Sequence, residues 1–531
     1  MIAFRAGFWS IETPSLRIGD LVSSIRTDES LFHSHSSACR VAATDSEILF
    51  TYETMQQRLT CRRIEENCIS LDCSITNTSS RSIRILSITP VEYCGDWSAM
   101  DEFTVSKNAR IHSYPAERCY GFDGGHPIES NEPVTSFWFA SIEDNDSGKN
   151  IFIGIDDVPQ GFVRVSLFPL LSHEENKRVI QWKLSIDCSA GFAGLRIEQN
   201  ETFHAGSIRL FFWEGNHEAG KKHVGKMLGE KFGRKKYRSI PTGWCSWYAG
   251  YEANISEEEC LKNLSAAEEI GSLTYFQIDD GWMKGRGTRT FGEPEVDGEK
   301  FPHGMKWMAE KIRERGLKPG LWIRPFEGWG DEKENPLWAR GSCIDLSQDE
   351  ALEWLRSMAR LIVQEWGFEY LKLDFLTYDY YGQWGMKFLD ATHARWSPRH
   401  DEQTNIQSYR RGLEAIREGA GDDCFLLGCN CHIGPALGLL DGIRIGDDVS
   451  AMHWERTVTM GMKSIPVMQF LNEHVWWNDP DCILLHGALT EEQQRLWANA
   501  VIDSGGMRMV SSKLYELSPE KRKLLGSLLK K

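Results

Sequence analysis

Three short apolar runs in the C-terminal half of the chain end in aspartates. They are FQIDDGW with Asp279 and Asp280, YLKLDF with Asp374, and IRIGDDV with Asp447 and Asp448. Polar residues that conclude an apolar strand are the first candidates for chemistry in a barrel enzyme, because active sites form at the carboxyl ends of the strands. Two carboxylates around one pocket can hydrolyse a glycosidic bond, since one attacks the anomeric carbon while the other protonates the leaving oxygen and then activates water.

The alternation of side chains along a strand indicates which aspartates face the same cavity. Lys372 and Asp374 share one face of their run, and Arg444 shares a face with Asp448. Asp447 falls on the isoleucine face, so the parity favours Asp448 as the inward carboxylate. The structural alternative is that each Lys or Arg with its Asp forms a simple ion pair at a strand end, or caps the following helix.

Tryptophans also gather at these strand ends, at positions 244, 247, 282, 322 and 329. Aromatic rings pack against the apolar faces of sugars, so we expect Trp244, Trp282 and Trp322 to contact the substrate. Burial in an ordinary core is the equally common alternative for a tryptophan in this position.

The elements that position these residues are strand-like runs alternating with helical segments, which is typical of a parallel sheet built from βα units. The expected strands are 242–248, 273–280, 317–326, 369–376, 424–430, 442–448, 465–471 and 507–512. Eight such units predict an α/β fold with a (β/α)8 TIM barrel, and an open doubly wound sheet is the alternative. Helix starts are expected where Ser256, Ser347 and Thr490 begin capping boxes and where Ser518 precedes Pro519.

Before the barrel, residues 1–215 contain short β-prone runs such as FVRVSLF (162–168) and SIRLFFW (207–213), many of them alternating apolar with polar residues. This pattern predicts an N-terminal antiparallel β-sandwich domain. The basic segment 216–240 is expected to be a partly helical linker, and 241–531 the catalytic barrel.

Composition excludes several classes of function. The chain has 531 residues, a formal net charge of −16 and 14 cysteines without framework spacing. The acidic balance disfavours nucleic acid as a partner, and no apolar run is long enough to span a membrane. The N-terminus lacks a basic segment followed by an apolar one, so we expect a cytoplasmic protein with reduced thiols. Assembly into a homo-oligomer is left open.

A metal site is the main competing chemistry. Cys429, Cys431 and His432 lie close together in the sequence, but a zinc site would require a second Cys/His cluster and none is visible. A metal-dependent barrel hydrolase would require histidines at strand ends, where only His432, His453 and His474 are near. We therefore expect no metal and no cofactor.

Several motifs in the same order and spacing resemble glycoside hydrolase family 36, the α-galactosidases, and more distantly family 27. They are PTGWCSWY, FQIDDGW, CIDLSQDE, YLKLDFL, LLGCNCHIGPALGLLDGIRIGDD and WWNDPDC, within residues 240–525. The resemblance implies that Asp374 is the nucleophile and Asp448 the acid/base. A proline often precedes the acid/base in this subgroup, whereas Asp447 stands there in this chain.

The resemblance also implies a set of sugar ligands. Asp279 and Asp280 match the acidic pair that binds the 4- and 6-hydroxyls of galactose, and Lys372 and Arg444 match further ligands. The loop that begins at Cys429 is expected to contact the substrate. The aspartates of WWNDPDC, 479 and 481, look structural in this family, and the C-terminal β-domain of the family is expected to be reduced or missing.

The leading hypothesis is hydrolysis of terminal α-galactosidic bonds with retention of configuration, on an oligosaccharide or glycoconjugate. Two alternatives keep the same site: an α-N-acetylgalactosaminidase, and an enzyme that transfers galactose to another sugar. A sugar-binding relative without catalysis is the alternative from another class.

Overall fold

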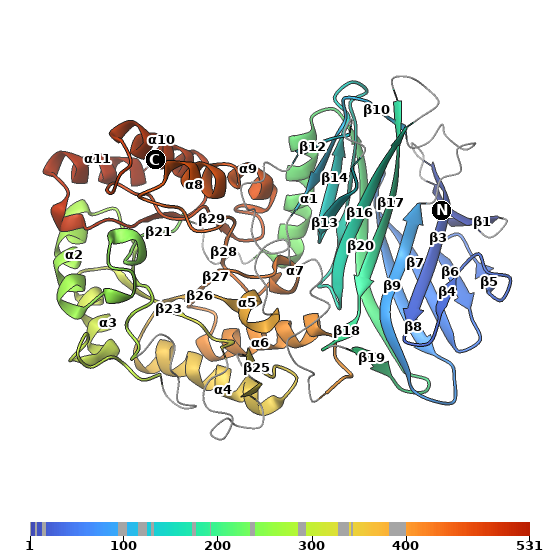
Figure 1. Cartoon of the computed structure of the whole chain (residues 1–531), viewed down its shortest axis with the longest axis horizontal. Helices are drawn as coiled ribbons and strands as arrows, with labels where there is room; N and C mark the ends of the chain where they lie inside the picture. The colour runs from blue at the N-terminus through green and yellow to red at the C-terminus, as the bar shows by residue number, and fades with distance from the viewer. Residues whose placement is uncertain are drawn as a thin grey trace. The chain divides into compact units, whose positions relative to one another are not determined.

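The computed structural model describes residues 2–5, 8–12, 17–93, 104–114, 125–128, 132–171, 177–191, 193–233, 239–284, 294–327, 339–340, 343–381 and 400–530 (Figure 1). The chain divides into two compact units. The first contains 1–116, 124–221 and 389–409, and the second contains 117–123, 222–388 and 410–531. No described helix is both long enough and apolar enough to cross a membrane.

The first unit contains two antiparallel sheets. The described strands of the larger sheet are β1 (Ile2–Arg5), β2 (Phe8–Glu12), β3 (Arg17–Thr27), β4 (Leu31–His33), β9 (Ile83–Tyr93), β10 (Thr104–Ser106), β13 (Val134–Phe137), β16 (Phe162–Leu171), β17 (Lys177–Asp187), β18 (Ser189–Ala190) and β19 (Ala193–Ile197). The described strands of the smaller sheet, in spatial order, are β12 (Gly125–Pro127), β11 (Arg110–Ser113), β14 (Phe139–Glu143), β15 (Lys149–Ile155), β20 (Thr202–Glu214), β8 (Cys68–Asn77), β7 (Met55–Glu65), β6 (Glu47–Thr51) and β5 (Arg40–Ala43).

Each sheet buries the apolar side of its alternating strands. In β8, Leu71, Cys73 and Ile75 are buried, whereas the polar residues between them are less so. Alternation of this kind is what the sequence of a strand with one buried face shows. The Phe32 ring, from the larger sheet, lies 5.5 Å from the Tyr52 ring, which follows β6 of the smaller sheet.

The segment expected to be a linker forms a regular helix, α1 (His217–Phe232). Its C-terminal half carries glycines four residues apart, at positions 225 and 229, and Gly233 follows the helix. A Cβ atom on Gly225 would lie 1.6 Å from the Phe470 carbonyl oxygen, and one on Gly229 would lie 2.5 Å from the His474 carbonyl oxygen. Glycine is therefore required at these positions because backbone packs directly on the helix.

The second unit contains a nearly closed parallel barrel. Its strands are β21 (Thr242–Cys245), β22 (Tyr275–Ile278), β23 (Lys318–Ile323), β26 (Tyr370–Leu373), β27 (Phe425–Gly428), β28 (Gly442–Arg444), β29 (Trp477–Asp479) and β30 (Arg508–Val510). The strands from β21 to β29 pair in chain order, and β30 pairs with β21, so β29 and β30 are the two ends of the described sheet. Between the last two strands the Met507 N–H donates to the Asn478 carbonyl at 2.8 Å, and Ile483 bridges to Val510. The predicted barrel is therefore confirmed as a nearly closed parallel barrel, and the alternative of an open doubly wound sheet is not.

The described helices of this unit include α2 (Glu257–Ile270), α3 (Gly304–Glu314), α4 (Asp349–Arg360), α5 (Leu376–Tyr381), α6 (Asn405–Ala420, which begins in the first unit), α7 (Ile433–Ala436), α8 (Trp454–Arg456), α9 (Ile465–Met468), α10 (Glu491–Asp503) and α11 (Pro519–Leu529). A short two-stranded sheet, β24 (Ala339–Arg340) with β25 (Cys343–Ile344), precedes α4. In Figure 1 the longer helices surround the barrel strands.

Three of the four expected helix caps are present. Ser256 accepts from the Glu259 N–H, Thr490 and Gln493 form a full capping box, and Ser518 caps α11 with proline in the first turn. Ser347 is the exception, because its hydroxyl donates to Asp345 at 2.7 Å instead. The helix then begins one residue later, after Gln348.

The prediction that the seventh barrel strand lies at 465–471 is wrong. These residues form α9 and a 3-10 turn, and strand seven is β29, within the WWNDPDC motif. This run is apolar except for Gln469, so it has no period that separates strand from helix, and Pro466 in the first turn suits a helix start. The consequence is functional, because Asp479 now ends a barrel strand.

Candidate active site

Asp374 directly follows β26, and two donors fix its carboxylate. The Trp322 indole N–H, from β23, donates to Oδ2 at 3.0 Å, and the Phe375 N–H donates to Oδ1 at 2.7 Å. Phe375 has a left-handed φ of +57°, which turns the chain out of the strand. The Asp374 side chain keeps an 8% exposed surface and is otherwise buried. The carboxylate is therefore held in one orientation at the carboxyl end of the barrel.

Lys372 and Asp279 form a buried ion pair between β26 and the end of β22. The Lys372 Nζ lies 2.9 Å from Asp279 Oδ2, which also accepts from the Gln277 side-chain amide at 2.6 Å. The Asp280 N–H donates to the other oxygen, Oδ1, at 2.9 Å. Burial opposes the charge on Lys372, but the carboxylate of Asp279 outweighs it and the pKa of Lys372 is raised well above its ordinary value. Of the two predicted sugar ligands, Asp279 is buried and Asp280 half-buried.

Arg444, the last residue of β28, contacts three carboxylates. Its Nε lies 2.9 Å from Asp479 Oδ2, its Nη2 3.0 Å from Asp481 Oδ1, and its Nη1 3.2 Å from Asp448 Oδ1. The hydroxyl of Tyr248 donates to the second oxygen of Asp481 at 2.7 Å. The Arg444 side chain is 3% exposed, whereas that of Asp448 is 42% exposed. Asp448 is thus the one carboxylate of this cluster that reaches solvent.

The two adjacent aspartates after β28 have different partners. Asp447 Oδ2 lies 3.4 Å from Arg456 Nη2, and its Oδ1 accepts the Asp448 N–H at 2.7 Å. Asp448 is the one that contacts Arg444. The structure therefore groups Arg444 with Asp448, as the alternation along the strand predicts.

The tryptophans play different parts from those expected. Trp244 and Trp282 are both 0% exposed, and their indole N–H groups donate to the carbonyls of Ser512 and Trp322, each at 2.9 Å. Neither offers a ring face to a sugar, so the structure assigns both to barrel packing. Trp322 is also buried and acts on the site through its hydrogen bond to the carboxylate of Asp374. Trp329 lies outside the described residues.

Cys429 follows β27 and is also buried, with its N–H donating to the Leu373 carbonyl at 2.7 Å. Its thiol interacts electrostatically with Lys372 and Arg444, and its contact with the substrate stays a prediction. Of the histidines considered for a metal site, His432 is buried and His453 exposed. Among the described residues, the one group close enough to share a metal ion lies in the first unit, at His112, Glu143 and His217.

Arg324, which follows β23, is a polar strand-end residue that the sequence analysis did not select. Its Nε donates to Asp379 Oδ2 at 2.9 Å, and its Nη1 lies 2.9 Å from Glu327 Oε1. Its guanidinium also stacks 4.3 Å from the centroid of the Phe375 ring, next to Asp374. The signal was present, because Arg324 falls at the end of the predicted strand 317–326.

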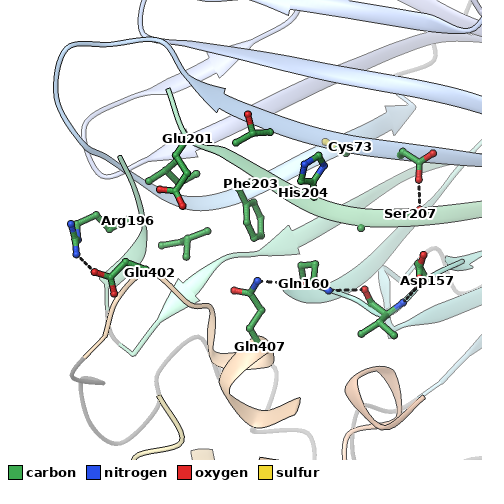
Figure 2. A pocket seen from close by; sticks show the side chains of 16 residues that line it. Cys73, Asp157, Gln160, Arg196, Glu201, Phe203, His204, Ser207, Glu402 and Gln407 are labelled. Atoms are coloured by element: carbon green, nitrogen blue, oxygen red, sulfur yellow. Dashed lines mark hydrogen bonds and ion pairs between the residues drawn. The ribbon is translucent and has the colours of Figure 1, made fainter. Parts of the chain in front are cut away.

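A separate cavity of about 550 Å³ lies in the first unit (Figure 2). Phe203 of β20 is directed into it, and the Gln407 side-chain amide donates to Gln160 Oε1 at 3.0 Å across one wall. Arg196 and Glu402 form an ion pair at its edge. The sequence patterns gave no indication of this cavity.

The fold and the site together define a barrel protein with paired carboxylates and buried cations at the carboxyl ends of its strands. The Melibiase family model matches residues 226–378, a segment that contains Lys372 and Asp374. The cluster around Arg444 and Asp448 lies beyond that segment.

Two curated relatives of this chain are named as alpha-galactosidases. The chain is 37% identical to Alpha-galactosidase mel1 of Schizosaccharomyces pombe over 84 residues, which is 15% of this chain and 19% of that protein. It is 29% identical to Probable alpha-galactosidase B of Talaromyces emersonii over 295 residues, which is 48% of this chain and 60% of that protein. The chain thus spans less than two thirds of the length of these curated relatives.

Solved structures share the fold over nearly the whole chain. TtGalA, an alpha-galactosidase from Thermus thermophilus in complex with stachyose, has a TM-score of 0.57 at 22% identity, with 93% of this chain and 99% of that chain covered. The GH36 alpha-galactosidase AgaA from Geobacillus stearothermophilus has a TM-score of 0.64 at 13% identity, with 99% of this chain and 75% of that chain covered. At these identities the likeness supports the fold.

Proposed function

We propose that this protein is a glycoside hydrolase that cleaves terminal α-galactosidic bonds with retention of configuration. One observation carries the proposal: at the end of β26, two N–H donors orient the carboxylate of Asp374, while Arg444 contacts the solvent-exposed Asp448 at the end of β28. The names of the relatives, and the stachyose in the complex of TtGalA, support an α-galactoside as the substrate class.

In this mechanism Asp374 attacks the anomeric carbon as Asp448 protonates the leaving oxygen, so the glycosidic bond breaks and a galactosyl ester forms. Asp448, now a carboxylate, removes a proton from water, and the water oxygen displaces Asp374 from the same carbon. Two inversions give net retention. The different exposures of the two carboxylates suit these roles, because the acid/base must exchange its proton with solvent and the nucleophile must not move.

The sugar ligands follow from the same cluster. We assign further sugar hydroxyls to the buried cations Lys372 and Arg444, and the 4- and 6-hydroxyls to Asp279 and Asp280. Since Asp279 already accepts from Lys372 and Gln277, its role is to hold the lysine as much as to bind sugar. Asp280, the more exposed of the pair, supplies the direct contact.

An aryl α-galactoside assay tests the activity, and proton NMR of the first-formed anomer tests retention. We expect Asp374→Asn to abolish phenol release. We expect Asp448→Asn to lose most activity on substrates with a poor leaving group and less on activated aryl substrates, because these need little protonation. Asp447→Asn is the matched control, as it changes the neighbouring aspartate that faces Arg456. Full activity in Asp374→Asn, or a larger loss in Asp447→Asn than in Asp448→Asn, contradicts the assignment.

The same assay separates the alternatives. Preference for an aryl α-N-acetylgalactosaminide identifies the aminosugar enzyme, and oligosaccharide products in the presence of acceptor sugars identify the transferring enzyme. Galactose binding by calorimetry without turnover identifies a sugar-binding relative.

We also propose a cytoplasmic location and a sandwich packing of the two N-terminal sheets. No disulfide joins the twelve cysteines among the described residues, which suits a reducing compartment. The contact of the Phe32 and Tyr52 rings supports face-to-face sheets. Assembly of identical copies stays a prediction, which light scattering of the purified protein tests.

A further inference from the structure

Two histidines and a glutamate from distant parts of the sequence meet in the N-terminal unit. His112 lies on β11, Glu143 ends β14, and His217 begins α1. One ligand atom from each lies within 4.8 Å of the others. The Nε2 atom of His112 is 2.8 Å from Glu143 Oε2, and the Nδ1 atom of His217 is 3.9 Å from the same oxygen.

The register of the sheet explains why His112 and Glu143 share a face. β11 pairs antiparallel with β14 so that His112 is opposite Ser141 and Arg110 is opposite Glu143. His112 and Glu143 are therefore diagonal neighbours on one side of the sheet, at a separation that long side chains can bridge. The start of α1 brings His217 to the same side, where the two imidazole rings lie 4.3 Å apart.

His217 has one satisfied nitrogen and one unsatisfied nitrogen. Its side chain is 1% exposed, and Nε2 lies 3.0 Å from the Ser141 hydroxyl. The buried Nδ1 makes no hydrogen bond with any part of the chain that the structure describes. Its nearest carboxylate oxygens are Glu218 Oε1 at 3.5 Å and Glu143 Oε2 at 3.9 Å. A buried polar atom without a partner carries a free-energy cost, so its position beside two other ligand atoms points to a missing ligand.

We propose that His112 Nε2, Glu143 Oε2 and His217 Nδ1 bind one zinc ion in the N-terminal unit, a structural site separate from the barrel. Two imidazoles and a carboxylate are ligands that Zn²⁺ accepts, whereas Mg²⁺ and Ca²⁺ prefer oxygen donors throughout. Ligand atoms about 2.0 to 2.1 Å from a tetrahedral zinc lie roughly 3.4 Å apart, so the three atoms need only small side-chain movements. A water molecule would complete the coordination.

The residues around the three proposed ligands suit a zinc site. The Ser141 hydroxyl bonded to His217 Nε2 orients the ring so that Nδ1 faces the other ligands, as outer groups do around metal-binding histidines. Among the described residues, Glu218 and Lys221 also face the site, and their carboxylate and ammonium lie 2.7 Å apart and offset one another. Glu143 therefore supplies the net negative charge that a divalent cation requires.

Zinc binding to the full-length chain tests the proposal. The protein is dialysed against a chelator, exchanged into buffer, and titrated with ZnCl₂ by calorimetry, with the bound metal counted by mass spectrometry. We expect one zinc per chain, a higher unfolding temperature with zinc, and no comparable binding of MgCl₂. Cobalt substitution should give the visible absorption of a four-coordinate Co²⁺ site.

Three variants and one control localise the site. His112→Gln and Glu143→Gln, which change the more exposed ligands, should each weaken zinc binding at least tenfold while the far-ultraviolet spectrum stays unchanged. His217→Asn removes the buried ligand and serves as the third variant if it folds. His303→Gln is the matched control, because His303 Nδ1 also contacts a glutamate, Glu257, at 2.7 Å but belongs to no group of three possible ligands among the described residues. Substoichiometric zinc in the wild type, or unchanged affinity in both His112→Gln and Glu143→Gln, overturns the proposal.

Discussion

Replacing Trp322 by phenylalanine removes one of the two donors that hold the carboxylate of Asp374. The indole N–H lies 3.0 Å from Oδ2, and the remaining donor is the Phe375 N–H at 2.7 Å from Oδ1. Phenylalanine keeps most of the apolar contact of the indole. Because Trp322 is buried, water does not readily replace the lost donor. The substitution therefore acts on the orientation and charge of one oxygen atom.

The size of the effect follows from the kind of hydrogen bond. A donor to a charged group contributes about 1.5 to 3 kcal/mol, which corresponds to roughly a 10- to 150-fold change in rate. The loss of this donor affects the formation and the hydrolysis of the galactosyl ester unequally. The carboxylate of Asp374 loses charge as the galactosyl ester forms and regains it as the leaving group when water attacks. The missing donor therefore slows the second step more, and the ester should accumulate.

Rapid mixing with an activated aryl α-galactoside measures both steps. In Trp322→Phe we expect a burst of phenol followed by a steady rate at least tenfold below that of the wild type. Trp244→Phe is the matched control, because that indole is also buried but donates to the Ser512 carbonyl, at 2.9 Å. The reasoning is refuted if the steady rate of Trp322→Phe stays within threefold of the wild type, or if Trp244→Phe loses as much activity.

Three further predictions concern stability. Gly225→Ala should lower the unfolding free energy by about 1 to 3 kcal/mol or more, since the new Cβ would lie 1.6 Å from the Phe470 carbonyl oxygen, and an unchanged melting temperature would contradict this contact. Lys372→Met should cost about 3 to 5 kcal/mol in urea titrations, because Asp279 would remain as a buried charge without its cation; a loss under 1 kcal/mol would mean that Asp279 is already neutralised by other donors. Burial opposes ionisation of Glu259, but hydrogen bonds from a lysine and two tyrosines lower its pKa from 4.5 to about 2. The ionised Glu259 should stabilise the fold by about 1 kcal/mol after screening by solvent, above pH 4.5, and this contribution should be lost as the pH falls towards 2. Glu259→Gln should therefore make the unfolding free energy depend less on pH over that range. Parallel pH profiles of the variant and the wild type would argue against this role of Glu259.

Local signals in the sequence were sufficient for most of the barrel. Seven of its strands lie within the predicted runs, and the caps at Ser256, Thr490 and Ser518 follow rules that depend on neighbouring residues alone. The seventh strand was placed wrongly because 465–471 is apolar except for Gln469, so it shows neither the period of a strand nor that of a helix. The three residues of β29 lie within a motif whose polar side chains concealed it.

The sequence predicts the placement of a site residue where that placement depends on alternation along one strand, but not where it depends on burial by distant residues. The grouping of Arg444 with Asp448 follows from alternation along one strand, and the contact at 3.2 Å confirms that grouping. Whether Trp244 lies at the surface or under another ring depends on Phe276, whose ring stacks on it at 4.3 Å, and no local pattern reports that contact. The cluster of His112, Glu143 and His217 unites residues that lie between 31 and 105 positions apart in the sequence, so it becomes visible only in the folded chain.

The correction at strand seven changes how Arg444 is understood. With β29 in place, Arg444 and Asp479 are register partners on adjacent strands, and Asp481 binds the same guanidinium from two residues further on. Two buried carboxylates thereby fix the planar guanidinium before any substrate arrives, which leaves Nη1 directed at Asp448. A rigid cation beside a half-exposed carboxylate can orient that carboxylate without burying it. The aspartates of WWNDPDC, 479 and 481, therefore serve the proposed chemistry indirectly. They fix the guanidinium of Arg444, and Arg444 orients the acid/base Asp448.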